Sequence, residues 1–329
     1  MAIVMGADRI LERIEALWDE LNELEDRLAA RFGGPPETTA RLLALEQAVR
    51  DLGARQEEIL AGTDRLLRRQ VTYLDDDVAL TTLESGERIY ADRRDGGIAT
   101  HLLTAGMWDP AHLSLFRRLL RAGDRVLDIG ANHGVYALAA AAAVGPSGEV
   151  HAYEPNPRLA ALARRSALIN GAAGWLHVHE AAVADEAGTG VLAFDGSWSA
   201  AGNIRKGRPE AAGLPVPVLA LDEVFTDPNL IVHAIKLDIE GGEGLALHGM
   251  RRLLERSPEV RILVNFAPSK LADAGTPAEE VAAMLAGLGL TPSEITTEGR
   301  PSPGTWDELL AAPGRMGKIL VARGEVLAL

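Results

Sequence analysis

The sequence predicts an α/β fold in which a doubly wound, mostly parallel sheet follows an N-terminal helical coiled-coil segment. From about residue 125 onward, apolar runs of strand length alternate with runs of helix type, a pattern typical of a parallel sheet with helices on both faces. Residues 7–70 instead repeat apolar side chains at coiled-coil spacing. We therefore expect a helical segment over residues 1–72 and an α/β domain over residues 73–329.

The N-terminal segment contains two apolar seams, separated by a break at residues 32–36. The first seam is Ile10, Ile14, Leu17, Leu21, Leu24 and Leu28, and the second is Leu42, Leu45, Val49, Leu52, Gln56 and Ile59. Gly53, Gly62 and the polar Gln56 weaken the second one. Helices of this kind fold back as a hairpin or pair with another copy, so we expect a homo-oligomer formed through residues 7–70. The alternative is an amphipathic segment that packs on the rest of its own chain.

Composition excludes several classes of protein. The 329 residues carry a net charge of −14 and contain no cysteine, so disulfides, thiolate metal sites and cysteine nucleophiles are ruled out. The acidic balance disfavours nucleic acid as a partner. No stretch reaches the ~18 apolar residues of a membrane span. The start lacks a basic region followed by an apolar core, so cytoplasmic residence is expected.

The α/β domain is expected to begin with a β-hairpin over residues 80–90, centred on Ser85-Gly86. Strands are expected at 125–129, 149–153, 176–183, 231–239, 260–266 and 318–322, with short strands and loops at 190–220. Helices are expected at 111–120, after 134, and at 157–170, 244–255 and 278–288. In such folds ligands bind beyond the carboxyl ends of the strands, which makes the residues at those ends candidates for function.

A glycine-containing turn, residues 128–134, follows the first core strand and opens a helix. Gly130 and Gly134 allow a tight turn and close approach of a ligand, and the helix start offers unpaired N–H groups. Asn132 occupies the middle-glycine position of a dinucleotide loop, and no lysine follows Gly134, so the turn fits neither phosphate-binding motif. Asp128 would repel a pyrophosphate but suits a ligand with a cationic end, such as S-adenosylmethionine. The alternative is a plain strand–turn–helix.

Two further strand ends carry acids that suit an adenosyl group. Glu154, within Glu154-Pro155-Asn156, is placed to accept both hydroxyls of a ribose, although such an acid also caps helices. Asp185, after Val183, could accept an adenine amine or be an ordinary turn residue.

The fourth core strand ends in a charged run that contains Lys236, Asp238, Glu240 and Glu243. Strand alternation predicts the first three on one side, either as a structural ion pair or as an acid cluster facing the reacting group. A carboxylate there could take the proton of an alcohol or orient its hydroxyl, and we expect Asp238 in this role, with Lys236 fixing its charge. Clustered acids also suit Mg²⁺ or Ca²⁺, although no metal is predicted. Glu243 could instead stabilise the start of the next helix. His177 and His179 share a strand face but have no third ligand beside them.

Together these segments resemble the FkbM family of S-adenosylmethionine-dependent methyltransferases. The matching stretches are 125–134, 150–157, 181–185, 221–224 and 235–243, with 106–110 as a similar lead-in. The pairing of the glycine turn with Lys-x-Asp-x-Glu-Gly-x-Glu is the specific part, and the resemblance covers roughly residues 75–300.

The resemblance implies a class I (Rossmann-like) methyltransferase fold and O-methylation of a hydroxyl on a sugar, glycan or secondary metabolite. Cofactor contacts are then expected at Asp128, Gly130, Ala131, Asn132, Gly134, Glu154, Pro155, Asn156, Val183 and Asp185, and catalytic residues at Asp238, Lys236 and Glu240. One departure is Asn265, where the family often has a glutamate that could act as base or metal ligand. Two alternatives stay open: an inactive, methyltransferase-like scaffold recruited through its coiled coil, and an N-methyltransferase, which the acidic charge and the missing Asn/Asp-Pro-Pro-Tyr motif disfavour.

Overall fold

The computed structural model describes residues 19, 23, 44, 47–57, 70–193, 203–206, 213–312, 314 and 317–324. The chain divides into two compact units, Met1–Arg68 and Arg69–Leu329. In the first unit every described residue is helical. Val49, Leu52 and Gln56 of the second seam lie on its helix over 47–57, and Leu52 is 64% exposed. The whole first seam lies outside the described residues, so the oligomerisation segment stays a prediction.

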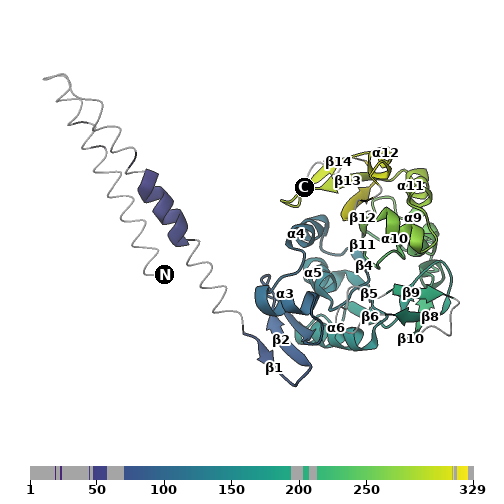
Figure 1. Ribbon diagram of the computed structural model, residues 1–329, viewed down its shortest axis with the longest axis horizontal. Coiled ribbons are helices and arrows are strands. Elements are labelled where there is room, and N and C mark those ends of the chain that lie inside the picture. The colour runs from purple at the N-terminus through teal and green to yellow at the C-terminus, as the bar shows by residue number, and fades with distance from the viewer. Residues whose placement is uncertain are drawn as a thin grey trace. The chain divides into compact units, whose positions relative to one another are not determined.

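The second unit is built on an eight-stranded sheet in the order β14-β13-β15-β12-β11-β4-β5-β6 (Figure 1). The strands are β4 (Arg125–Ile129), β5 (Glu149–Tyr153), β6 (Leu176–His179), β11 (Ala234–Leu237), β12 (Arg261–Asn265), β13 (Thr291–Ile295), β14 (Pro301–Pro303) and β15 (Lys318–Ala322). Strands β6, β5, β4, β11 and β12 are parallel, whereas β15 runs antiparallel beside β12. The chain first winds from β4 out to β6 and then from β11 out past β12. This doubly wound, mostly parallel sheet confirms the predicted fold class.

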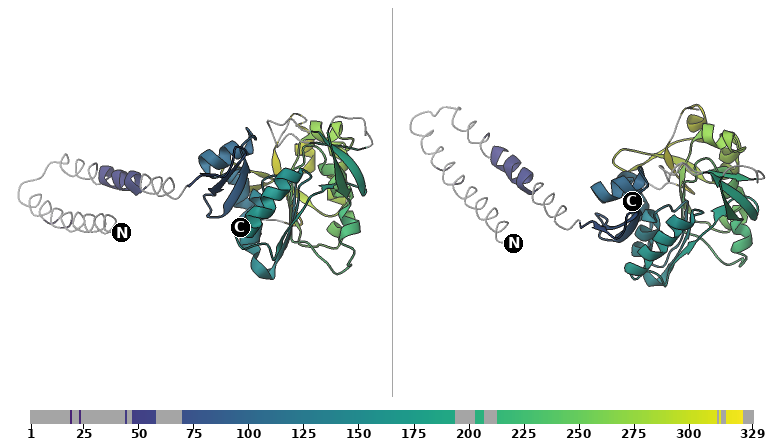
Figure 2. Two further views of the ribbon diagram at one scale, coloured as in Figure 1. Left: turned by 90° about the horizontal axis from the view of Figure 1, so that it is seen from below. Right: turned by 60° about the horizontal axis from the view of Figure 1, so that its bottom comes forward.

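Helices cover both faces of the sheet, as Figures 1 and 2 show. One face packs against α3 (Ile98–Ala105), α4 (Pro110–Leu119), α5 (Val135–Val144) and α6 (Pro157–Ile169). The other packs against α7 (Leu221–Val224), α8 (Glu243–His248), α9 (Arg251–Glu255), α10 (Pro268–Asp273), α11 (Ala278–Gly287) and α12 (Trp306–Leu310). Strand alternation divides β4 between these cores, since Val126 joins the first and Leu127 and Ile129 the second.

Two smaller sheets complete the unit. Strands β1 (Thr72–Tyr73), β2 (Val78–Thr82) and β3 (Arg88–Asp92) form the first, and the β2–β3 pair confirms the predicted hairpin. Strands β7 (Ala182–Val183), β8 (Gly188–Ala193), β9 (Asn203–Lys206) and β10 (Leu214–Leu219) form the second.

Two predicted strands are shorter than expected. The predicted strand 176–183 is wrong as a single element, because β6 ends at His179 and residues 182–183 pair with β10 in another sheet. The predicted strand 231–239 is reduced to residues 234–237. Left-handed backbone conformations at Glu240 (φ 56°) and Gly241 (φ 107°) then turn the chain into α8. Asp238 and Glu240 therefore lie in a turn, where strand alternation no longer sets the direction of their side chains.

Candidate active site at the carboxyl edge of the sheet

The glycine turn lies directly against the turn that follows β11. Gly130 adopts φ 81°, and a Cβ there would lie 2.1 Å from the Asp238 carbonyl oxygen. Asn132 is also left-handed, at φ 52°, and Gly134 begins α5 at φ 90°. A side chain at position 130 would therefore collide with the backbone of the acidic segment. The structure brings together the two sequence motifs that the resemblance paired.

Glu154 holds the glycine turn from the neighbouring strand. Its carboxylate accepts hydrogen bonds from the backbone N–H groups of Asn132 and Asn156, both at 2.8 Å. Burial raises the pKa of Glu154 to about 7, against the opposing effect of these two hydrogen bonds. Asn156 in turn caps α6, accepting from the N–H of Arg158 at 3.0 Å, with Pro157 in the first turn.

Asp128 and Lys236 form a buried ion pair beneath the turn. They are register partners on β4 and β11, and Lys236 Nζ lies 3.4 Å from Asp128 Oδ1. The same ammonium donates to the Gly130 carbonyl at 2.6 Å. Neither Asp128 oxygen accepts a hydrogen bond of normal geometry from the described residues. Burial raises the pKa of Asp128, and the charge of Lys236 opposes that rise.

Asp238 is held by groups from two other strands, β12 and β15. Its Oδ2 lies 3.0 Å from Lys318 Nζ, and its Oδ1 accepts from Asn265 Nδ2 at 3.2 Å. Burial alone would raise the pKa of Asp238. The charges of Lys236 and Lys318, with the hydrogen bond from Lys318, outweigh burial and hold that pKa below its ordinary value. The side chain remains 22% exposed, so it is accessible to a ligand.

Asp109 extends this network toward α4 and α5. It accepts hydrogen bonds from Tyr136 Oη at 2.8 Å and from His112 Nδ1, and Lys318 Nζ lies 2.9 Å from its Oδ2. Burial would raise the pKa of Asp109, but the His112 hydrogen bond and the Lys318 charge hold it far below its usual range. An unbroken line of contacts therefore runs from Tyr136 through Asp109 and Lys318 to Asp238.

The remaining acids of the predicted cluster have separate partners. Glu240 forms an ion pair with Lys270, whereas Glu243 accepts from the N–H groups of Ile239 and Gly241, both at 2.8 Å. Burial raises the pKa of Glu243 to about 7. Across residues 70–193 and the other described parts, no three His, Asp or Glu side chains form a group able to hold a metal ion.

Val183 and Asp185 lie beside a different element. Ala184 donates its N–H to the Leu219 carbonyl at 3.0 Å, and a Cβ at Gly249 would lie 3.1 Å from the Asp185 Cα. Gly249 ends α8, the helix that Glu243 begins. Asp185 is thus packed near the end of that helix, and its contact with the cofactor stays a prediction.

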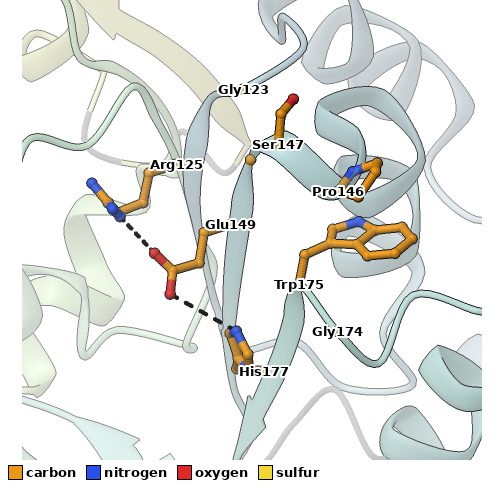
Figure 3. A pocket seen from close by; sticks show the side chains of 9 residues that line it. Gly123, Arg125, Pro146, Ser147, Glu149, Gly174, Trp175 and His177 are labelled. Carbon is orange, nitrogen blue, oxygen red and sulfur yellow. Dashed lines mark hydrogen bonds and ion pairs between the residues drawn. The ribbon is translucent and has the colours of Figure 1, made fainter.

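A cavity of about 230 Å³ lies at the opposite edge of the sheet, where β4, β5 and β6 begin (Figure 3). Its lining includes Arg125, Glu149, Trp175 and His177. Glu149 accepts from Arg125 Nε at 2.9 Å and lies 3.8 Å from His177 Nε2. Arg125 and Glu149 form an ion pair within the cavity, and the cavity lies away from the glycine turn.

Sequence reasoning missed Asp109, Tyr136 and Lys318. Asp109 lies in the predicted lead-in, and Lys318 is the single charge at the start of the last apolar strand. An isolated lysine in an apolar strand was the sequence signal for a functional role. The antiparallel register of β15, which pairs Lys318 with Asn265, brings this lysine to the site.

Comparison with known proteins identifies the domain. Residues 128–289 match the model of the methyltransferase FkbM domain. No curated protein matches the chain. Two similar solved structures are an S-adenosylmethionine-dependent O-methyltransferase from Thermotoga maritima (16% identity, 77% of this chain and 94% of that chain covered, TM-score 0.37) and the O-methyltransferase TomG from Streptomyces achromogenes (16%, 72% and 92%, TM-score 0.40). The glycine turn, the acidic segment and the family match together show that this chain is an S-adenosylmethionine-dependent methyltransferase with an FkbM domain over residues 128–289.

Proposed function

We propose that the protein transfers a methyl group to a hydroxyl oxygen of a sugar, glycan or secondary metabolite. The observation that carries this proposal is the partly exposed carboxyl group of Asp238, whose backbone lies directly against the glycine turn. A carboxylate in that position can accept a hydrogen bond from an incoming hydroxyl. No covalent intermediate on the protein is needed, because orientation and exclusion of water supply most of the acceleration.

S-adenosylmethionine fits the residues around the turn better than a phosphate-bearing ligand does. Asp128, Glu154 and Asp238 carry carboxyl groups, and the two cations beside them already have partners: Lys236 is directed to Asp128 and Gly130, and Lys318 to Asp109 and Asp238. We assign the cofactor to Asp128, Gly130, Asn132, Gly134 and Glu154. When bound, the cofactor supplies a methyl group on a cationic sulfur.

Asp238 is then a hydroxyl-orienting group more than a strong base. Its lowered pKa means that the carboxylate binds a proton weakly at neutral pH. With the cofactor bound, the acceptor hydroxyl would donate a hydrogen bond to Asp238 while an oxygen lone pair forms the new bond to the methyl carbon. The bond from that carbon to sulfur would break with its electron pair left on sulfur, which becomes a neutral thioether. The hydroxyl proton would pass to water by way of the carboxylate. The positive charge of Lys236 also favours the ionised form of Asp238.

The substitution Asp238→Asn tests this role. The amide keeps the size of the side chain but removes the charge, so turnover should fall by about 10²-fold or more. Binding of S-adenosylmethionine, measured by calorimetry, should stay within about threefold. Asp273→Asn is a matched control, because Asp273 is an exposed carboxylate at the end of α10. Full turnover in Asp238→Asn would remove Asp238 from the mechanism.

A screen for methyl transfer over sugars, glycans and metabolites, followed by mass spectrometry, would identify the acceptor. The alternative expected from the sequence, a scaffold without activity, rested on Asn265, because an amide cannot act as a base. In the site, however, Asn265 donates to Asp238. Calorimetry separates the two, since a scaffold that has lost the cofactor site would not bind S-adenosylmethionine.

A further inference from the structure

Lys318 is a buried cation shared by two carboxylates. Its side chain is 14% exposed, and its Nζ lies 2.9 Å from Asp109 Oδ2 and 3.0 Å from Asp238 Oδ2. Burial would lower the pKa of Lys318, but the charges of Asp238 and Asp109 raise it above its usual range. Lys318 therefore stays protonated and acts as a fixed positive charge.

Asp109 is itself held in an unfavourable backbone conformation. It precedes α4 at φ 53° and ψ 53°, and its side chain makes no capping hydrogen bond to that helix. The carboxylate is directed instead to Tyr136, His112 and Lys318. A non-glycine residue keeps a left-handed conformation only where surrounding contacts enforce it, and such residues are concentrated at functional sites.

The choice of lysine supports a role specific to this edge. The chain contains four lysines among its 33 lysine and arginine residues. Three of them, Lys236, Lys270 and Lys318, each pair with an acid of the candidate site. A lysine ammonium is a compact point charge that can lie between two carboxylates, whereas a guanidinium is a planar fork.

Several other groups act on the Asp238 carboxylate. The charged and titratable ones that face it are Lys236, Lys318, Asp109, Asp128, Tyr136 and Glu243. Only the two lysines favour its ionised form, and of these Lys318 alone makes a hydrogen bond to it. The acids Asp109, Asp128 and Glu243 act in the opposite direction.

We propose that Lys318 is a positioning residue for methyl transfer: held by Asp109, it fixes the Asp238 carboxylate as an ionised acceptor for the substrate hydroxyl. This inference rests on the proposed O-methyltransferase function. It assigns Lys318 no contact with the substrate. It adds to Lys236 a second cation that acts on Asp238, carried by β15, a strand outside the two motifs that define the site.

The first test follows the Asp238 carboxyl by ¹³C NMR in the full chain with labelled aspartate, using Asp238→Asn to assign the signal. In Lys318→Met the titration midpoint should rise by about one pH unit or more, since a nearby opposite charge lowers a carboxyl pKa by ~1–3 units. Lys270→Met is the matched control, because Lys270 pairs with Glu240 and should leave the midpoint unchanged. An unchanged midpoint in Lys318→Met would refute the proposal.

Asp109→Asn removes a negative charge from the same network, whereas Lys318→Met removes a positive one. The new side chain has the same size and shape, so this variant provides a test even where Lys318→Met does not fold. Removing the Asp109 charge leaves Lys318 to Asp238 alone, so the Asp238 midpoint should stay or fall. A rise would refute the assignment of Lys318 as the cation that sets the Asp238 charge.

The second test uses methyl transfer to an acceptor found in the screen. In Lys318→Met, kcat should fall at least tenfold at pH 7, the acidic limb of the pH profile should move upward, and binding of S-adenosylmethionine should be unchanged. Wild-type kcat and pH profile in this variant would refute the positioning role while leaving the enzyme function intact. A wild-type protein without any transfer would refute the O-methyltransferase proposal, and the titration would still decide the assignment of Lys318.

Discussion

Gly130→Ala should damage both the stability of the domain and its cofactor site. An alanine at φ 81° is strained, at a cost of ~1–2 kcal/mol for an L-residue in the left-handed region. The added Cβ would also lie 2.1 Å from the Asp238 carbonyl oxygen and 2.8 Å from a methyl carbon of Ile239. Because the first neighbour is backbone, the turn after β11 must move, which adds ~1–3 kcal/mol. The total is ~2–5 kcal/mol.

Gly275→Ala separates the two contributions. Gly275 has φ 90°, but a Cβ there would meet no atom within 4 Å, so only the backbone strain remains. Scanning calorimetry of the whole chain should show a melting temperature lower by roughly 5–15 °C in Gly130→Ala and by a few degrees in Gly275→Ala. Titration calorimetry should show loss of S-adenosylmethionine binding in Gly130→Ala alone. Equal melting temperatures together with wild-type binding in both variants would refute the close contact between the two turns.

Two further predictions concern a buried acid and the N-terminal segment. Because the folded pKa of Glu243 is about 7, above the ordinary value of 4.5, the folded state binds more protons than the unfolded state between these pH values. Wild-type stability should therefore lose about 3 kcal/mol from this group as pH rises through that window, and denaturant unfolding from pH 4.5 to 8 should show Glu243→Gln lacking this loss. The same pH dependence of the unfolding free energy in the wild type and Glu243→Gln would contradict this prediction. Deleting residues 1–70 should reduce the mass in light scattering to that of a monomer without changing cofactor affinity; an unchanged oligomer would show that other residues form the interface.

The sequence predicted the parts of the site that depend on local rules. A strand, a glycine turn and a helix are readable within residues 125–144, and the left-handed conformations of Gly130 and Gly134 follow the expected use of glycine. The alternation of helix and strand patterns likewise predicted the doubly wound sheet.

The sequence did not predict which charged side chains pair with one another. The charged run 236–243 looked like one cluster, yet two of its acids pair with residues far away in sequence: Asp238 binds Lys318, and Glu240 binds Lys270. Glu243 instead accepts from the nearby N–H groups of Ile239 and Gly241. Lys236 pairs with Asp128, which precedes it by more than a hundred residues, because β11 lies beside β4 with these two residues opposite each other. Such pairings depend on strand order and on where a strand ends. Local spacing therefore gives the residue types at the site, and topology gives the pairs.

The register of the sheet explains why Lys318 reaches the same site as Lys236. Alternate residues of each strand face the core formed with α3–α6, as Val126, Ala234, Leu263 and Leu320 do. Asp128, Lys236 and Asn265 each follow one of the first three residues by two positions, so they share its face and lie nearer the carboxyl edge of the sheet. Lys318 reaches the same edge by preceding Leu320 by two positions, because β15 is antiparallel to β12. Four polar side chains from four adjacent strands thus share one face at one edge of the sheet. Because β15 runs antiparallel beside β12, its first residue, Lys318, lies at the carboxyl edge of the parallel strands, against Asp238. Replacing Lys318 should therefore change the pKa of Asp238 and leave the glycine turn unchanged.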